Sequence, residues 1–157
     1  MPRRRIRSWL PGVILVLALL QFFQPTPPGP VLPGDGPIGN HVDVPPRVDA
    51  ILRTACYDCH SGETRWPWYA RVSPVSWIIA GDIEHGRGNL DFSQWSTHPT
   101  REPTQVQRLR WICRDMLEDV MPPRSYRWMH REARLSAQQK DMICVWSQRT
   151  RDHLAES

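Results

Sequence analysis

The sequence predicts an all-α protein in which a small helical domain follows an apolar N-terminal helix and a proline-rich linker. Three observations support this fold class. Apolar residues from Val48 onward recur at i, i+3 and i+4 spacing, the period of an amphipathic helix. No alternating apolar pattern long enough for a useful strand occurs. The 157 residues allow one domain, and we divide the chain at residues 1–23, 24–45 and 46–153.

Residues 1–23 have the layout of a signal peptide or signal anchor. Four arginines precede Trp9–Phe23, an uncharged and mostly apolar run of 15 residues. The run ends in bulky residues and not in small ones, which favours an uncleaved anchor. It is shorter than the roughly 20 apolar residues of a usual membrane helix, so flanking residues would have to contribute. The positive-inside rule places the arginines in the cytoplasm and the rest of the chain outside the cytoplasmic membrane.

Charge argues against one class of function. The chain has 20 Lys and Arg against 16 Asp and Glu, but four of the arginines stand before Trp9. From Gln24 onward the count is 16 against 16. A nucleic-acid footprint needs a basic excess, so nucleic acid is not an expected partner.

The next segment is expected to be a spacer. Residues 24–47 contain eight prolines and four glycines and have no apolar periodicity. Such a composition prefers extended, semi-rigid conformations and cannot pack a core. We expect residues 24–45 to hold the domain off the membrane.

Four helices are expected in the domain. The first follows Pro46, and the second begins at Ser73-Pro74 and stops at Gly86. A loop over roughly 87–102 precedes the third helix, which Pro122-Pro123 must end. The fourth begins with a capping box of Ser136 and Gln139. The predicted apolar faces are Val48, Ile51, Leu52, Ala55, Cys56 and Cys59; Val75, Ile78, Ile79 and Ile83; Val106, Leu109, Ile112, Cys113, Met116, Leu117 and Val120; and Met142, Ile143, Trp146 and Thr150.

The motif that carries chemistry is Cys56-Tyr57-Asp58-Cys59-His60, which is C-x-x-C-H, the attachment signature of c-type haem. Two thiols at this spacing can each form a thioether to a haem vinyl group. The residue after the second thiol then places its imidazole under the iron, which makes His60 the proximal ligand. The cofactor expected is one haem c, bound covalently through Cys56 and Cys59.

Two other functions of the C-x-x-C cysteines are less consistent with the sequence. A zinc site would need two further ligands, and the remaining cysteines, Cys113 and Cys144, stand alone in sequence. A thioredoxin-like site would need a strand followed by a helix and does not explain His60. Cys113 and Cys144 form an even pair in an oxidising compartment, which favours a disulfide, but Cys144 lies off the apolar face of its helix. The sequence leaves that bridge open.

A second axial ligand to iron is expected, and Met121 is our first choice. It lies between a helix and Pro122-Pro123, whose fixed dihedrals stiffen the loop; the alternative is an apolar plug at the helix end. Met129 is second and His130 third. The other candidates are Met116, Met142, His85, His98 and His153, of which Met116 and Met142 fall on apolar helix faces.

The residues resemble a known family, the small haem-binding, cytochrome-c-like domain of exported bacterial proteins. The resemblance rests on residues 55–87 (ACYDCHSGETRWPWYARVSPVSWIIAGDIEHGR), on 121–136 (MPPRSYRWMHREARLS) and on a last helix with Ile143 and Trp146. It covers about 46–150. It implies a c-type cytochrome fold around one haem, with Cys56, Cys59 and His60 as attachment and proximal residues, and it supports Met121.

Aromatic residues after the motif are candidates for the haem pocket. Trp66, Trp68 and Tyr69, with Trp77, are expected to wall the porphyrin or to be ordinary core. Arg65 and Arg71 are candidate partners of the propionates. Pro67 or Pro74 would offer the backbone carbonyl that orients His60.

The function expected is a membrane-tethered monohaem c-type cytochrome that transfers single electrons to redox partner proteins on the extracytoplasmic, periplasmic side. An alternative is a haem-based sensor or ligand-binding module with a displaceable sixth ligand. A peroxidase would need an open iron site and a distal acid-base group; His85 or His98 could be proposed, but nothing in the sequence places either on the distal side. We therefore do not expect an enzyme.

Overall fold

The computed structural model describes residues 3–26, 29, 36–95 and 103–156. Within these residues the protein is helical and contains no strand, which confirms the all-α class. The α-helices are α1 (Arg3–Leu20), α2 (Pro46–Ala55), α3 (Tyr57–His60), α4 (Val75–Asn89), α5 (Gln105–Leu117), α6 (Arg124–Met129) and α7 (Ala137–Glu156). Single 3₁₀ turns occur at η1 (Ile38–Asn40), η2 (Trp68–Arg71) and η3 (Arg131–Ala133).

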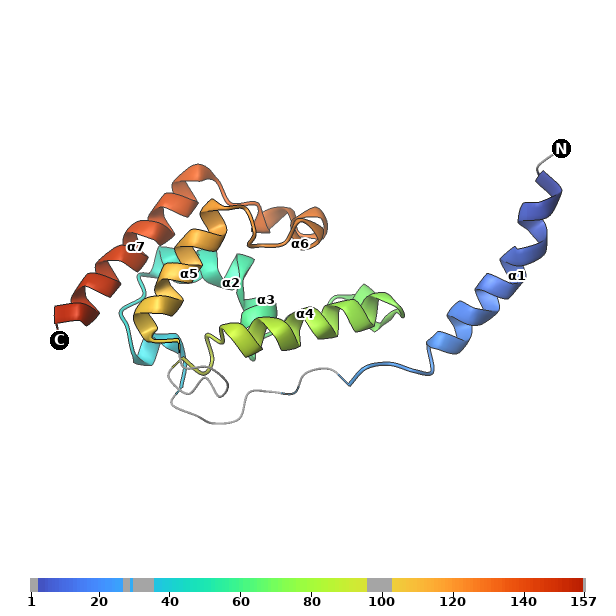
Figure 1. Cartoon of the computed structure of the whole chain (residues 1–157), viewed down its shortest axis with the longest axis horizontal. Helices are drawn as coiled ribbons and strands as arrows, with labels where there is room; N and C mark the ends of the chain where they lie inside the picture. The colour runs from blue at the N-terminus through green and yellow to red at the C-terminus, as the bar shows by residue number, and fades with distance from the viewer. Residues whose placement is uncertain (1–2, 27–28, 30–35, 96–102, 157) are drawn as a thin grey trace.

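Helices α5 and α7 lie side by side and form the largest helix pair of the domain (Figure 1). Each begins with a capping box, formed by Thr104 and Gln107 at α5 and by Ser136 and Gln139 at α7. The second of these boxes was predicted from the sequence and is confirmed. The boxes supply partners for backbone N–H groups that a helix start leaves unpaired.

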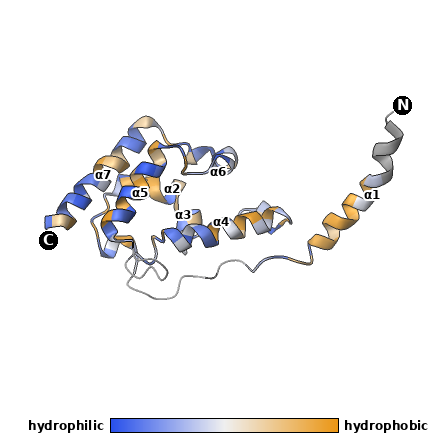
Figure 2. Cartoon of the chain, viewed as in Figure 1, coloured by the Kyte–Doolittle hydropathy of each residue, from blue (hydrophilic) through white to orange (hydrophobic). Residues whose placement is uncertain are grey.

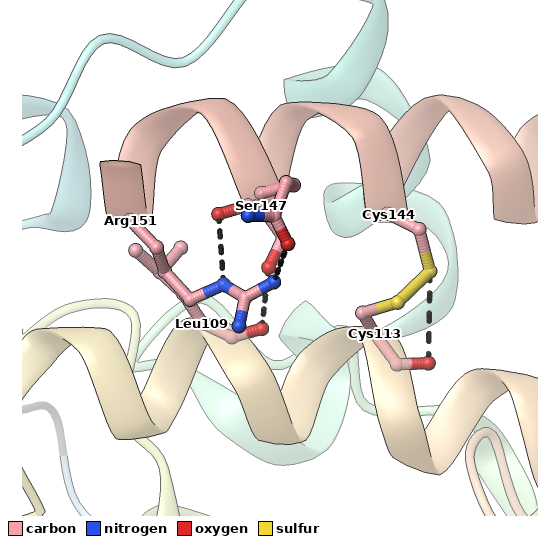
Figure 3. Close-up of a disulfide and its surroundings, with 6 residues drawn as sticks. Leu109, Cys113, Cys144, Ser147 and Arg151 are labelled. Carbon is pink, nitrogen blue, oxygen red and sulfur yellow. Dashed lines mark hydrogen bonds between the residues drawn. A yellow bond between two sulfur atoms is a disulfide. The ribbon is translucent and has the colours of Figure 1, made fainter. Parts of the chain in front are cut away.

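A disulfide between Cys113 and Cys144 joins α5 to α7, and the two Cα atoms are 4.9 Å apart. Figure 3 shows the bridge beside a second contact between the same helices, in which Ser147 Oγ donates a 2.6 Å hydrogen bond to Leu109 O. The sequence left open whether Cys113 and Cys144 form a disulfide, and the packing of the two helices brings them together. Cys144 reaches Cys113 because α7 presents both residue 144 and the buried Ser147 to α5.

The core is built from apolar residues of α2, α5 and α7 together with segments outside the helices. Ile38 and Val42 precede α2 yet belong to this core, with Ile38 only 2% exposed. The buried core therefore includes residues from Ile38 onward, eight positions before the boundary at 46. Phe92 and Trp95, in the segment expected to be a loop, are fully buried and stack on each other.

Two predicted helix ends differ from the observed ones. Helix α4 continues past Gly86 to Asn89. Helix α5 stops at Leu117, before Pro122-Pro123, because Asp119 adopts a left-handed conformation (φ 57°). Asp119 N donates to Met116 O and Val120 N donates to Asp115 O, which is the Schellman pattern of helix termination. Val120 is exposed beyond the helix end.

The N-terminal helix α1 projects away from the domain (Figure 1), and its apolar side chains from Trp9 to Leu19 are exposed (Figure 2). Among the residues that the structure describes, no helix combines the length and the apolarity needed to cross a membrane. The chain after α1 turns back to the domain. Gln21 and Gln24 both hydrogen-bond to Ser73, so the end of the apolar run and the first residue of the expected spacer contact the domain directly.

Candidate functional site

The C-x-x-C-H motif forms a tight turn between α2 and α3. Cys56 is the C-cap of α2 and the N-cap of α3. Its carbonyl accepts hydrogen bonds from Cys59 N (3.2 Å) and His60 N (3.0 Å). These bonds hold the two thiols and the imidazole on one short stretch of helix. All three side chains line the same cavity.

The cavity has a volume of about 830 Å³ and lies between α3, α4, α6 and the end of α5. A site of this size is in the range of pockets that hold organic ligands. One wall comes from α4, where Val75, Ile78, Ile79 and Ile83 face the cavity. The apolar face predicted for this helix is thus partly a cavity wall, and Ile78 is 61% exposed.

The imidazole of His60 is oriented by the backbone of Leu90. His60 Nδ1 lies 2.9 Å from Leu90 O. A carbonyl can only accept, so Nδ1 carries the proton and Nε2 keeps its lone pair. Burial lowers the pKa of His60 below its ordinary value, against the opposing effect of the bond to Leu90. The orienting carbonyl belongs to Leu90, and the expected choice of Pro67 or Pro74 was wrong.

The segment after α4 contacts His60 through Phe92. Phe92 N donates a 2.7 Å hydrogen bond to His60 O, and the two rings meet edge to face at 6.3 Å. Phe92 also stacks on Tyr57, with ring centroids 5.1 Å apart. Sequence reasoning missed Leu90 and Phe92, although two apolar residues two positions apart in a segment expected to be a loop were a signal that the segment is buried.

The thiols of Cys56 and Cys59 are free and are not bonded to each other. Burial raises the pKa of Cys56 to about 12 and that of Cys59 to about 11. Both are therefore neutral thiols at neutral pH. Cys113 and Cys144 are bonded to each other and cannot complete a zinc site.

Met121 also lines the cavity and is half-buried. Its backbone is fixed by the end of α5, since Val120 N and Met121 N both donate to Asp115 O at 3.0 Å. The structure therefore brings the first-choice axial ligand into the cavity that holds His60.

The other ligand candidates divide into those that line the cavity and those that do not. His130 Nε2 is 2.7 Å from the hydroxyl of Tyr69, and its ring stacks on Tyr126 at 4.2 Å. Met116, Met129 and His85 line the cavity with His130. Met142 and His153 are not among the lining residues, and His98 is outside the described part of the chain.

Two of the four aromatic candidates line the cavity, and Trp77 does not. Trp66 and Tyr69 are lining residues, whereas Trp68 lies outside the lining and is 78% exposed. Arg65 also lines the cavity, but its guanidinium is paired with Asp58, with Nη2 3.0 Å from Oδ2. Arg71 is exposed and does not line it.

Helix α4 approaches the motif closely at Gly86. A Cβ atom at this position would stand 2.6 Å from Cys59 O, closer than any side chain tolerates against backbone. Gly86 is therefore a close-packing residue between α4 and the second cysteine. The prediction that the helix stops at Gly86 was wrong. Glycine stands there because the lack of a side chain permits this close contact.

The haem-binding domain family model matches residues 15–149 of the chain. The chain belongs to the haem-binding domain family. The resemblance seen in the C-x-x-C-H and M-P-P-x-x-Y-x-x-M-H motifs is thereby confirmed. No curated protein and no solved structure matches the sequence.

The residues of this haem-binding domain fit a haem. The wall from α4 is largely apolar, as a porphyrin face requires, and the lining side chains include the imidazole of His60, with Nε2 free, and the thioether of Met121. This is the His and Met pair of many electron-carrying cytochromes. Two neutral thiols stand beside the imidazole. Among the described residues there is no cluster of three or more His, Cys, Asp and Glu side chains that would hold a bare metal ion.

Proposed function

We propose that this haem-binding domain is a membrane-associated monohaem c-type cytochrome that carries single electrons on the extracytoplasmic side. The observation that carries the proposal is the meeting of Cys56, Cys59, His60 and Met121 in one apolar cavity of about 830 Å³. These residues come from two segments about 60 positions apart in the chain. The bound haem would supply the one-electron couple of its iron.

The chain's own residues would bind and orient that group. The thiols of Cys56 and Cys59 would each add across a vinyl group, which fixes the haem covalently. Leu90 O holds the imidazole of His60 with Nε2 free to bind iron. Met121 would supply a thioether ligand, which raises the reduction potential relative to a second histidine. The proposal assigns no catalytic step to the chain.

Two features support an extracytoplasmic location. The Cys113–Cys144 disulfide is typical of oxidising compartments. The apolar run Trp9–Phe23 follows four arginines, and its large side chains, including Phe22 and Phe23, are exposed in the structure. We propose that this run holds the protein at the cytoplasmic membrane with the arginines inside.

Absorption spectra of the purified full chain test the iron ligands. We expect a low-spin spectrum with a sulfur-to-iron band in the oxidised protein, no change on adding carbon monoxide to the reduced protein, and loss of the band in Met121→Ala. Met142→Ala is the control, because Met142 does not line the cavity. A high-spin haem that binds carbon monoxide readily would contradict electron transfer and favour the sensor function.

Haem attachment is tested on a denaturing gel stained for haem. The double variant Cys56→Ala, Cys59→Ala should lose covalent haem because both attachment thiols are gone. The double variant Cys113→Ser, Cys144→Ser should keep it, because that pair lies in the α5–α7 contact. Pigment that survives the first change would overturn the c-type assignment.

A further inference from the structure

The chain just after α1 is bonded to the start of α4. Gln21 and Ser73 exchange two hydrogen bonds, from Gln21 Nε2 to Ser73 O (3.2 Å) and from Ser73 N to Gln21 Oε1 (3.1 Å). Gln24 Nε2 donates a third, of 2.8 Å, to Ser73 Oγ. A side-chain amide that both gives and accepts on one residue fixes position more firmly than a single bond. The end of the apolar run is therefore held against the domain.

The following residues run along α4. Trp77 Nε1 donates a 2.7 Å hydrogen bond to Phe23 O, and Arg87 Nη1 donates one of the same length to Gly29 O. Trp77 and Arg87 stand near opposite ends of α4. Phe23 and Gly29 are thus both bonded to the helix that walls the cavity.

Large apolar side chains are exposed around this junction. We call them the apolar edge. They do not line the cavity, so a bound haem would not cover them. In Figure 1 the start of α4 projects toward the side of the molecule where α1 lies, and Figure 2 shows the apolar character of α1 on that side. The members of the apolar edge are Phe22, Phe23, Trp68, Val72 and Trp77, with exposed fractions of 83, 69, 78, 41 and 39%.

We infer that the apolar edge rests on the surface of the lipid bilayer and so orients the haem domain against the membrane. This inference rests on the proposed membrane association of the apolar run. Phe23 is the last residue of that run, which places it at the boundary between lipid and water. Trp77 is bonded to the carbonyl of Phe23 and therefore lies at the same depth.

The chemistry of the apolar edge matches a bilayer surface. Tryptophan is enriched at the membrane–water interface, where its ring is in the apolar zone and its N–H is near polar groups. Arg71, between Trp68 and Val72 in the chain, is exposed and can meet anionic headgroups. A soluble protein rarely exposes such apolar side chains together without a partner surface.

The orientation has a consequence for the cavity. Val75 and Ile78 line the cavity and directly follow the part of the apolar edge that ends at Val72. The cavity wall nearest the start of α4 then lies next to the bilayer. Redox partners in solution would approach the haem from the sides formed by α6 and the end of α5.

Spin labels on the full, haem-loaded chain in vesicles of phosphatidylcholine and phosphatidylglycerol test the inference. One label is placed at Arg71→Cys, beside the apolar edge, and the matched control label at Arg149→Cys on α7, also exposed. The mass of the labelled protein should correspond to one label per chain, which confirms that the other four cysteines are covalently bonded and do not react. We measure the accessibility of each nitroxide to oxygen, which concentrates in lipid, and to a water-soluble nickel chelate. The oxygen-to-nickel ratio should be higher at residue 71 than at residue 149.

The contact with Ser73 provides a second test of the orientation, by substitution of the residues that make it. The double variant Gln21→Ala, Gln24→Ala should lower the ratio at residue 71 while the protein still floats with vesicles, whereas Gln138→Ala, an exposed glutamine on α7, should not. Equal ratios at residues 71 and 149 in protein that floats would overturn the orientation alone and leave the edge to another occupant. Protein that does not float would overturn the membrane association, and the orientation with it.

Discussion

Tyr126 donates a 2.6 Å hydrogen bond to Oδ2 of Asp58, although 68 positions separate the two residues. Asp58 stands between the two cysteines of C-x-x-C-H, and Tyr126 lies in α6, five residues after Met121. Arg65 completes the contact with Nε 3.1 Å from Oδ1 and Nη2 3.0 Å from Oδ2. A buried carboxylate thus joins the segment of His60, the candidate proximal ligand, to the segment that follows Met121, the candidate axial ligand.

Replacing Tyr126 by Phe should destabilise the fold. The change deprives a carboxylate that is 6% exposed of one donor, which costs about 1–3 kcal/mol of the free energy of unfolding. Urea unfolding followed by circular dichroism measures the loss. Tyr69→Phe is the control, because the Tyr69 hydroxyl is bonded to His130 and not to a buried carboxylate. An equal loss in both variants would contradict a special role for Asp58.

Acid should remove part of the stability through Asp58. Burial raises the pKa of this carboxyl, but the hydrogen bonds from Arg65 and Tyr126 outweigh burial and hold the pKa below its ordinary value. The folded pKa is thus lower than the unfolded pKa of about 3.9. The stabilisation is complete above the unfolded pKa and is lost as the pH falls through the folded pKa. Unfolding free energies measured from neutral pH down to about pH 3 should fall less steeply in Asp58→Asn.

Alanine at Gly86 should be harmful, and alanine at Gly81 should not. The new Cβ at position 86 would lie 2.6 Å from Cys59 O, so α4 must shift away from the motif. We expect a loss of about 1–3 kcal/mol in unfolding free energy and less covalent haem per chain. At Gly81, in the same helix, no atom lies within 4 Å of the added Cβ. That variant should gain about 0.5–1 kcal/mol from helix propensity, and similar losses at both positions would refute the packing argument.

Opening the Cys113–Cys144 bridge should destabilise the domain. The bridge closes a loop of 31 residues, for which chain entropy predicts about 3–4 kcal/mol. Urea midpoints with and without a thiol reductant give the difference. The double variant Cys113→Ser, Cys144→Ser serves as control, since its midpoint should not respond to reductant. An unchanged midpoint on reduction of the native chain would show that the bridge adds no stability.

Local patterns predicted much of the fold. The apolar period of residues 48–55 predicted α2, and Ser136 with Gln139 predicted the start of α7. Both predictions depend on contacts within one turn of helix, and the residues that make such contacts are close neighbours in the sequence. The end of α5 was harder to predict. Asp119 adopts a left-handed conformation that glycine usually takes, whereas the sequence indicated that proline would end the helix.

The candidate site shows a similar division. Cys56, Cys59 and His60 were found from spacing alone, since a helical turn brings residues three and four positions apart together. Leu90 O was not found, because it lies 30 positions from His60 and a backbone carbonyl has no signature in the sequence. Trp68 was expected near the haem from its neighbours in the chain, and the structure instead places it on the apolar edge.

The sequence by itself determined the helical class, the C-x-x-C-H motif and the apolar N-terminal run, because each depends on residues that are close neighbours in the chain. Tertiary structure alone decided that Cys113 meets Cys144, that Tyr126 reaches Asp58 and that Gln21 holds Ser73. These contacts join residues 31, 68 and 52 positions apart. They depend on how whole helices pack, since side chains so distant in the chain meet only after the core has fixed the helices' directions.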